Sequence, residues 1–268
     1  FITPSFCYTG LIMKWFFKQV SEKTVKLTEM SREQLIYHAV PHFLGEIMAK
    51  YFRMEVEGME HVPKTGAGLI TSNHSGYSGF DAFLLCHHIF QQIKRTPRVL
   101  THHFWFLNQT TAIPAKKMGF IEASRKNGIS TLKKKKLLLI FPEGEYGNFK
   151  PSTKRYKLQP FKKGLVRMAL ATGAPIIPVL VIGAEETHIN LAQLKFTKYL
   201  RGLVLPLPLN VIPLPARWKI KFLPPFNLKH GPEAVEDDTL VRHIAEDLRD
   251  YMQIELDKEL KNRKGVYL

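Results

Sequence analysis

A histidine and an aspartate lie seven residues apart in the segment Asn73–Asp81, which reads NHSGYSGFD. A histidine can act as a general base when a carboxylate accepts a hydrogen bond from one of its ring nitrogens, because that bond fixes the tautomer and stabilises the imidazolium that forms. Asp81 is the nearest acid that can do this for His74. The pair alone leaves two interpretations open, since a histidine among the 11 of this chain is more often an ordinary surface or core residue.

The position of the pair in the chain strengthens the catalytic interpretation. An apolar run, Gly68–Ser72, comes directly before it, and a helical pattern follows it. Ligands of open α/β sheets bind in the crevice at the carboxyl ends of the strands. On one continuous helix, residues seven apart would be about 10 Å from each other, too far for a hydrogen bond. We therefore predict that Gly76–Gly79 forms a loop, that a helix starts near Gly79, and that Asp81 lies in its first turn.

Three further motifs follow in the chain: GFIEASR at 119–125, FPEG at 141–144 and APIIPV at 174–179. Arg125 comes just after a predicted strand, and the planar fork of an arginine suits a phosphate group. Glu143 is able to accept hydrogen bonds from substrate hydroxyls or to hold a basic partner, and Gly144 permits close approach of the backbone. Each motif also has an ordinary explanation: a surface arginine, a plain turn, and a strand that starts with a proline.

Together, in this order and spacing, the four motifs resemble those of the glycerolipid acyltransferase family, of the lysophosphatidic acid and glycerol-3-phosphate acyltransferase type. The resemblance covers about Val56–Glu186. It implies transfer of a fatty acyl group from acyl-coenzyme A or acyl carrier protein to the hydroxyl of a lysophospholipid or glycerol phosphate, with no cofactor and no metal. By implication His74 is the general base and Asp81 its partner. The implied acceptor-binding residues are Gly119, Arg125, Glu143 and Gly144, and the implied pocket residues are Asn73, Pro175 and Pro178.

Two departures from the family pattern leave the acceptor open. Six residues separate His74 from Asp81, where the family usually has four, and longer spacings resemble the branch of monoacylglycerol and diacylglycerol acyltransferases. FPEG is followed by Glu145 and Tyr146 instead of Thr-Arg, which removes a possible phosphate contact. The basic residues that offer a replacement are Lys150, Lys154, Arg155 and Lys157. The alternatives are therefore a neutral or unusual acceptor, such as an aminolipid, or a catalytically idle membrane-binding module, against which the intact motif residues argue.

The rest of the chain predicts an α/β fold with a largely parallel or mixed central sheet flanked by helices, because short apolar runs alternate with helical patterns. The predicted strands are Phe52–Val56, Gly68–Ser72, Arg98–Thr101, Gly119–Glu122, Leu137–Phe141, Ile176–Ile182 and Trp218–Phe222. The predicted helices are Phe80–Gln91, Phe104–Gln109, Gly128–Lys135, Phe161–Thr172 and Asp238–Lys261.

We expect three parts. Residues 1–51 form a helical, membrane-associating segment, since Ser31–Gln34 matches a capping box and helical spacing continues beyond a break at Pro41. Residues 52–235 form the acyltransferase domain. Residues 236–268 form a C-terminal helix packed on that domain, because Leu240, Ile244 and Leu248 begin an apolar stripe at helical spacing.

The net charge of +16 and the pI near 9.8 call for a polyanionic partner. The basic residues are scattered between apolar runs, without zinc-finger spacing or an aromatic–basic signature, which favours an anionic bilayer over nucleic acid. Two cysteines, Cys7 and Cys86, are too few for a disulfide framework and indicate a reducing, cytoplasmic-side location.

No segment reaches the ~20 apolar residues that span a bilayer. Two come partway: Phe1–Val20, and Leu200–Pro215, whose four prolines exclude a regular helix. Core packing and shallow immersion in one leaflet remain open for both. The prediction is a peripheral or monotopic protein on the cytoplasmic face of a membrane.

Overall fold

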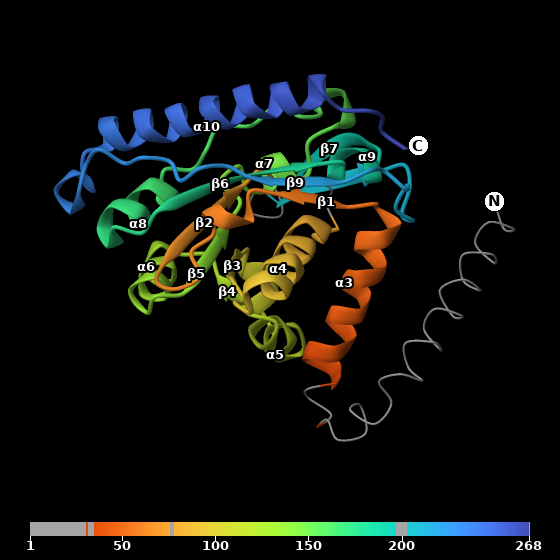
Figure 1. Cartoon of the computed structure of the whole chain (residues 1–268), viewed down its shortest axis with the longest axis horizontal. Coiled ribbons are helices and arrows are strands. Elements are labelled where there is room, and N and C mark those ends of the chain that lie inside the picture. The colour runs from red at the N-terminus through yellow and green to blue at the C-terminus, as the bar shows by residue number, and fades with distance from the viewer. Residues whose placement is uncertain (1–30, 32–34, 76–77, 197–202, 268) are drawn as a thin grey trace, which may run out of the picture. The chain divides into compact units, whose positions relative to one another are not determined.

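The computed structural model describes residues 31, 35–75, 78–196 and 203–267, which form two compact units, 1–50 and 51–268 (Figure 1). The first unit contributes a π-helical turn, Leu35–Ala39, and most of helix α3 (Val40–Tyr51). Pro41 is the second residue of α3, and the helical geometry changes from π to α directly before it, between Ala39 and Val40. Most of the capping box, and the apolar segment Phe1–Val20, lie outside the described residues.

A seven-stranded sheet is the centre of the second unit (Figure 1). In spatial order its strands are β1 (Glu55–Glu57), β9 (Lys219–Phe222), β6 (Ile176–Ile182), β2 (Gly68–Ser72), β5 (Leu137–Ile140), β3 (Arg98–Thr101) and β4 (Phe120–Glu122). The pairing is parallel throughout, except that β6 and β9 are antiparallel. The predicted α/β fold with a largely parallel or mixed sheet is confirmed.

Strand β2 is the middle strand, and all five of its residues are buried. Such strands read as continuous apolar runs because helices cover both faces of a parallel sheet. Helices α8 (Gly164–Thr172) and α10 (Asp238–Lys261) lie on one side of the sheet, and α4 (Phe80–Ile93) lies on the other (Figure 1). The apolar stripe of α10 contributes Ile244, Leu248 and Met252 to the core, as its spacing predicted.

Side-chain caps account for two differences in helix position. The predicted helix 104–109 is wrong: a 3-10 turn occupies His103–Phe106 (η3), and helix α5 runs from Gln109 to Lys117. Asn108 starts α5 because its side chain accepts a hydrogen bond from the Thr111 N–H. Ser124 likewise accepts from the Asn127 N–H, so α6 (Arg125–Lys133) starts three residues earlier than predicted. Shorter helical turns are η2 (Met59–His61), α7 (Glu145–Asn148), η4 (Ser152–Lys154), α9 (Ala184–Thr187) and η5 (Pro232–Ala234).

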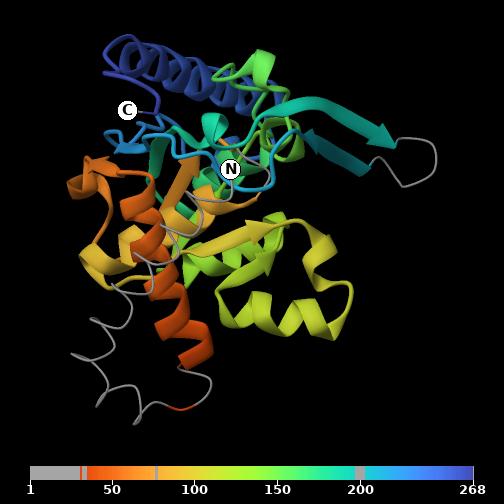
Figure 2. The same ribbon diagram turned by 90° about the vertical axis from the view of Figure 1, so that its right-hand side faces the viewer.

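An antiparallel hairpin stands apart from the sheet. It consists of β7 (Asn190–Phe196) and β8 (Leu203–Pro208), and it projects from the body of the unit (Figure 2). The sequence did not predict it, because prolines in LVLPLP obscure the strand pattern. Prolines are tolerated here since this two-stranded sheet consists of edge strands. Among the described residues, no helix has the length and apolar character to cross a bilayer.

Candidate active site

His74 lies two residues beyond the end of β2, at the carboxyl edge of the sheet. Its Nδ1 is 2.6 Å from Oδ2 of Asp81. On one face its ring stacks on Phe141, with centroids 4.1 Å apart, and its side chain retains 16% exposure. Because Nδ1 donates to the carboxylate, the Nε2 lone pair is available as a base.

The position of Asp81 is fixed by helix α4 and by hydrogen bonds from the backbone. It lies in the first turn of α4, which starts after Gly79 in the left-handed conformation, with φ of 73°. The carboxylate is fully buried and accepts hydrogen bonds from the peptide N–H groups of Ser75, at 3.0 Å, and Ala82, at 2.7 Å. The predicted helix start and the predicted approach of Asp81 to His74 are confirmed, while residues 76 and 77 of the loop lie outside the described residues.

Asn73 differs from its expected place in the pocket wall. Its side chain is fully buried and forms two hydrogen bonds with the backbone of Val181: Nδ2 donates to the carbonyl at 2.9 Å, and Oδ1 accepts from the N–H at 2.7 Å. Asn73 therefore ties the end of β2 to β6 and holds the backbone from which His74 projects.

Glu143 was expected to contact the acceptor, but the structure turns its carboxylate inward. Oε1 accepts from the N–H of His74 at 3.0 Å, and Oε2 accepts from the N–H of Gln159 at 2.7 Å. Only 1% of Glu143 is exposed, and Gly147 packs so closely that a Cβ there would lie 2.4 Å from the Glu143 Cβ. Glu143 thus positions the main chain of His74, and its carboxylate is directed into the protein.

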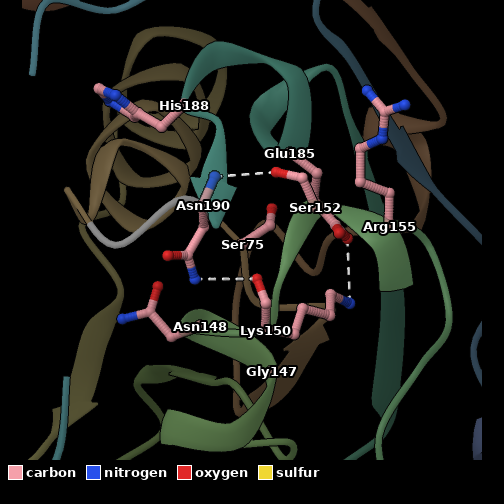
Figure 3. Close-up of a pocket in the computed structure, with 9 residues that line it drawn as sticks. All are labelled: Ser75, Gly147, Asn148, Lys150, Ser152, Arg155, Glu185, His188 and Asn190. Carbon is pink, nitrogen blue, oxygen red and sulfur yellow. Dashed lines mark hydrogen bonds and ion pairs between the residues drawn. The ribbon is translucent and has the colours of Figure 1, made fainter. Parts of the chain in front are cut away.

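A buried lysine forms the next layer. Lys150 Nζ lies 3.0 Å from Oε1 of Glu185 (Figure 3). It also lies 3.6 Å from Oε2 of Glu143, so it is no replacement for a surface phosphate contact. Burial raises the pKa of Glu185 to about 7, although Lys150 opposes the shift. The two carboxylates raise the pKa of Lys150 against the effect of its own burial. The other basic residues proposed for this role, Lys154, Arg155 and Lys157, are exposed.

Replacing Lys150 by methionine should lower the free energy of unfolding by about 3–5 kcal/mol at pH 8, because two buried carboxylates lose their cation. Folding raises the pKa of Glu185 from 4.5 to about 7. Between these values the Glu185 carboxyl therefore binds more protons in the folded protein than in the unfolded chain. Stability therefore falls as pH rises from about 4.5 through 7, and the loss in Lys150→Met should be smaller at pH 5 than at pH 8. Urea unfolding at both values measures this.

The exposed neighbour Lys154 provides the matched control, since Lys154→Met should change stability by less than about 0.5 kcal/mol. An equal loss at both pH values in Lys150→Met would contradict the assigned ion pairs.

Two predicted site residues, Gly119 and Pro175, lie at the edge of the sheet opposite to His74. Gly119 directly precedes β4, and Pro175 directly precedes β6, whereas His74 follows a strand that is parallel to both. They are therefore separated from the carboxyl edge by the length of a strand. Pro178 is buried within β6, level with Thr71 of β2. The structure therefore does not bring Gly119 and Pro175 together with His74.

Arg125 does lie at the same edge as His74. It is the first residue of α6, just beyond β4, which is three strands from β2, or about 14 Å. Its side chain is 47% exposed, and its guanidinium lies 3.1 Å from the exposed carboxylate of Glu236. Such an exposed ion pair is weak, so an anionic ligand would compete with it effectively.

Two contributors to this edge were missed in the sequence. Phe141 supplies the surface on which His74 stacks, and only its place at the end of a predicted strand pointed to it. Lys162 approaches Gly144 so closely that a Cβ on this glycine would lie 2.8 Å from Nζ. Gly144 has a φ of 61°, which also favours glycine. Burial lowers the pKa of His102, and Lys162 lowers it further while Glu145 opposes the shift, so Lys162 places a positive charge near the end of β3.

Similar proteins are found both by comparison of the sequence and by comparison of the structure. The acyltransferase family model matches residues 53–182. An uncharacterised protein of Mycobacterium tuberculosis is 31% identical over 248 residues, covering 85% of this chain and 69% of its own length. A chloroplastic 1-acyl-sn-glycerol-3-phosphate acyltransferase of Brassica napus is 24% identical over 154 residues, covering 54% and 43%. The fold matches the 1-acyl-sn-glycerophosphate (LPA) acyltransferase PlsC of Thermotoga maritima, with a TM-score of 0.52, 16% identity and 94% coverage of both chains.

Proposed function

Because this chain belongs to the acyltransferase family, we propose that it transfers a fatty acyl group from an acyl thioester to the free hydroxyl of lysophosphatidate, forming phosphatidate for phospholipid biosynthesis. The observation that carries the proposal is the 2.6 Å contact between His74 and a buried, doubly hydrogen-bonded Asp81. A membrane-binding module without catalysis has no use for such a pair.

The reaction proceeds by direct transfer. Nε2 of His74 takes the proton of the acceptor hydroxyl as its oxygen attacks the thioester carbonyl, while Asp81 stabilises the imidazolium. The tetrahedral intermediate then collapses: the carbon–sulfur bond breaks and the imidazolium returns its proton to the leaving thiolate. Ser75, beside His74 in the chain, is buried and lines a separate small cavity, which disfavours an acyl-serine intermediate (Figure 3).

The charges along the sheet edge support a phosphate-bearing acceptor. With its hydroxyl at His74, a lysophosphatidate lying along this edge directs its phosphate toward Lys162 and Arg125. Either anionic donor, acyl-coenzyme A or acyl carrier protein, suits the same positive surface. Acyl transfer from each radiolabelled donor to lysophosphatidate, glycerol 3-phosphate and monoacylglycerol tests the proposal, and a preference for monoacylglycerol would overturn the choice of acceptor.

Arg125→Ala should raise KM for lysophosphatidate about tenfold, since a hydrogen bond to a charged group contributes about 1.5–3 kcal/mol. The KM for monoacylglycerol should not change. Glu236→Ala is the matched control: it removes the other half of the same exposed ion pair and should leave KM equal or lower. An equal effect of Arg125→Ala on both acceptors would contradict a phosphate contact.

The substrates also indicate where the protein works. Both the acceptor and the product are lipids, and the net charge of +16 favours an anionic surface. We place the protein at the cytoplasmic face of a membrane, where it acts from the surface.

A further inference from the structure

We propose that the exposed apolar side chains of β7, of β8 and of the coil after β8 form a membrane contact, which inserts into the interface of an anionic phospholipid bilayer beside the active site. This inference rests on the proposed function for the identity of the partner, because lipid substrates require the active site to face a bilayer. The residues that carry it form an exposed apolar set, which we call the apolar face: Leu194, Leu205, Leu207, Leu209, Val211 and Ile212.

The apolar face is unusual for a surface in contact only with water. Leu209, Val211 and Ile212 are 64%, 80% and 76% exposed. Soluble proteins rarely gather large exposed apolar side chains in one continuous patch, and such patches mark contact with protein or membrane.

Strand geometry brings the hairpin members of the apolar face together, and Val211 and Ile212 follow them in the chain. Leu194 pairs with Leu205, and Ala192 pairs with Leu207, across the hairpin. Because alternate residues of a strand point to the same side, Leu205, Leu207 and Leu209 share one face. The hairpin projects outward from the unit (Figure 2), and the side chains of these three leucines are exposed, so they are accessible to a bilayer.

Hydrogen bonds attach the base of the hairpin to the segment that follows FPEG. The Asn190 side chain donates to the carbonyls of Phe149, at 2.7 Å, and Lys150, at 3.1 Å, and it accepts from the N–H of Leu207. The Asn190 N–H donates to the Ser152 hydroxyl at 2.9 Å (Figure 3). Three contacts link the hairpin to His74: the bond from Asn190 to the Lys150 carbonyl, the ion pair of Lys150 with Glu143 at 3.6 Å, and the bond from the His74 N–H to Glu143.

Charge identifies the partner as a bilayer. Ser152, bonded to the hairpin base, belongs to a segment in which Lys154, Arg155 and Lys157 are exposed. Apolar side chains next to exposed basic residues are typical of surfaces that insert shallowly and bind anionic headgroups at the same time.

The test is sedimentation of the full chain with phosphatidylcholine vesicles that contain about 30% phosphatidylglycerol, which supplies the anionic surface. The triple variant Leu207→Gln, Leu209→Gln, Val211→Gln should bind about 10–100-fold more weakly than the wild type. Its unfolding midpoint should be unchanged, since all three side chains are exposed. Ile254→Gln, on an exposed position of α10, is the matched control and should bind as the wild type does.

A second measurement separates this inference from the proposed function. The triple variant should lose transfer to long-chain lysophosphatidate in vesicles but keep transfer between short-chain, water-soluble substrates. Unchanged vesicle binding in a folded triple variant would overturn the inference and leave the proposed function intact. A wild-type dimer that the triple variant converts to monomer would also overturn it, by showing that the apolar face contacts a second copy. If no substrate pair reacts, the proposed function fails, and vesicle binding is still measurable.

Discussion

Substitution of His74 by alanine is expected to lower kcat for acyl transfer by about 10²–10⁴-fold, the contribution of a general base. The alcohol of the acceptor is a weak nucleophile until its proton is removed. Under the proposed function His74, which lies at the carboxyl edge of the sheet, is the base that removes it. The substitution removes a partly exposed ring and no buried charge, so the fold should be retained. Steady-state kinetics with acyl-coenzyme A and lysophosphatidate measure the effect.

His243→Ala is the matched control, because His243 is exposed on α10, on the far side of the sheet from α4. It should retain wild-type kcat. Near-wild-type transfer by a folded His74→Ala variant would contradict the assignment of the base.

Asp81→Asn is expected to lower kcat by a similar factor, about 10²–10⁴, with a smaller change in KM. An asparagine keeps the shape of the side chain but presents an NH₂ group or a neutral oxygen to Nδ1, so the ring is no longer held in the tautomer that leaves Nε2 unprotonated. It also removes the negative charge that stabilises the imidazolium. The measurement is kcat and KM over a range of pH.

Stability must be followed alongside, since the buried carboxylate accepts two peptide N–H groups. Asp247→Asn, at an exposed position of α10, controls for the chemical change itself. A folded Asp81→Asn variant with unchanged kcat would show that His74 works without its carboxylate.

The sequence predicted the His–Asp geometry because local rules determine it. Two side chains seven positions apart on one helix are too far from each other for a hydrogen bond, and two glycines in the segment allow the chain to turn. The central strands were also predictable, since buried parallel strands appear as uninterrupted apolar runs. In β2 and β6 the predicted and observed bounds agree.

The roles of motif residues were harder to predict, because a motif does not state which end of a strand it occupies. Gly119 and Pro175 belong to the same motifs as residues near the site, yet each lies before its strand and not after it. Glu143 has the chemistry of a ligand, and only its tertiary contacts show that it faces His74 and Gln159. The hairpin was missed for a different reason. Proline is tolerated in an edge strand, but the sequence does not show which strands lie at an edge, so the prolines argued against a strand here.

The central claim is that this chain makes phosphatidate by transfer assisted by His74. The most direct measurement incubates the purified protein with radiolabelled acyl-coenzyme A and lysophosphatidate, separates the lipids and quantifies free thiol. The wild type should form labelled phosphatidate with one equivalent of free coenzyme A, and His74→Ala should form almost none. No labelled phosphatidate from the wild type, or equal amounts from both proteins, would contradict the claim.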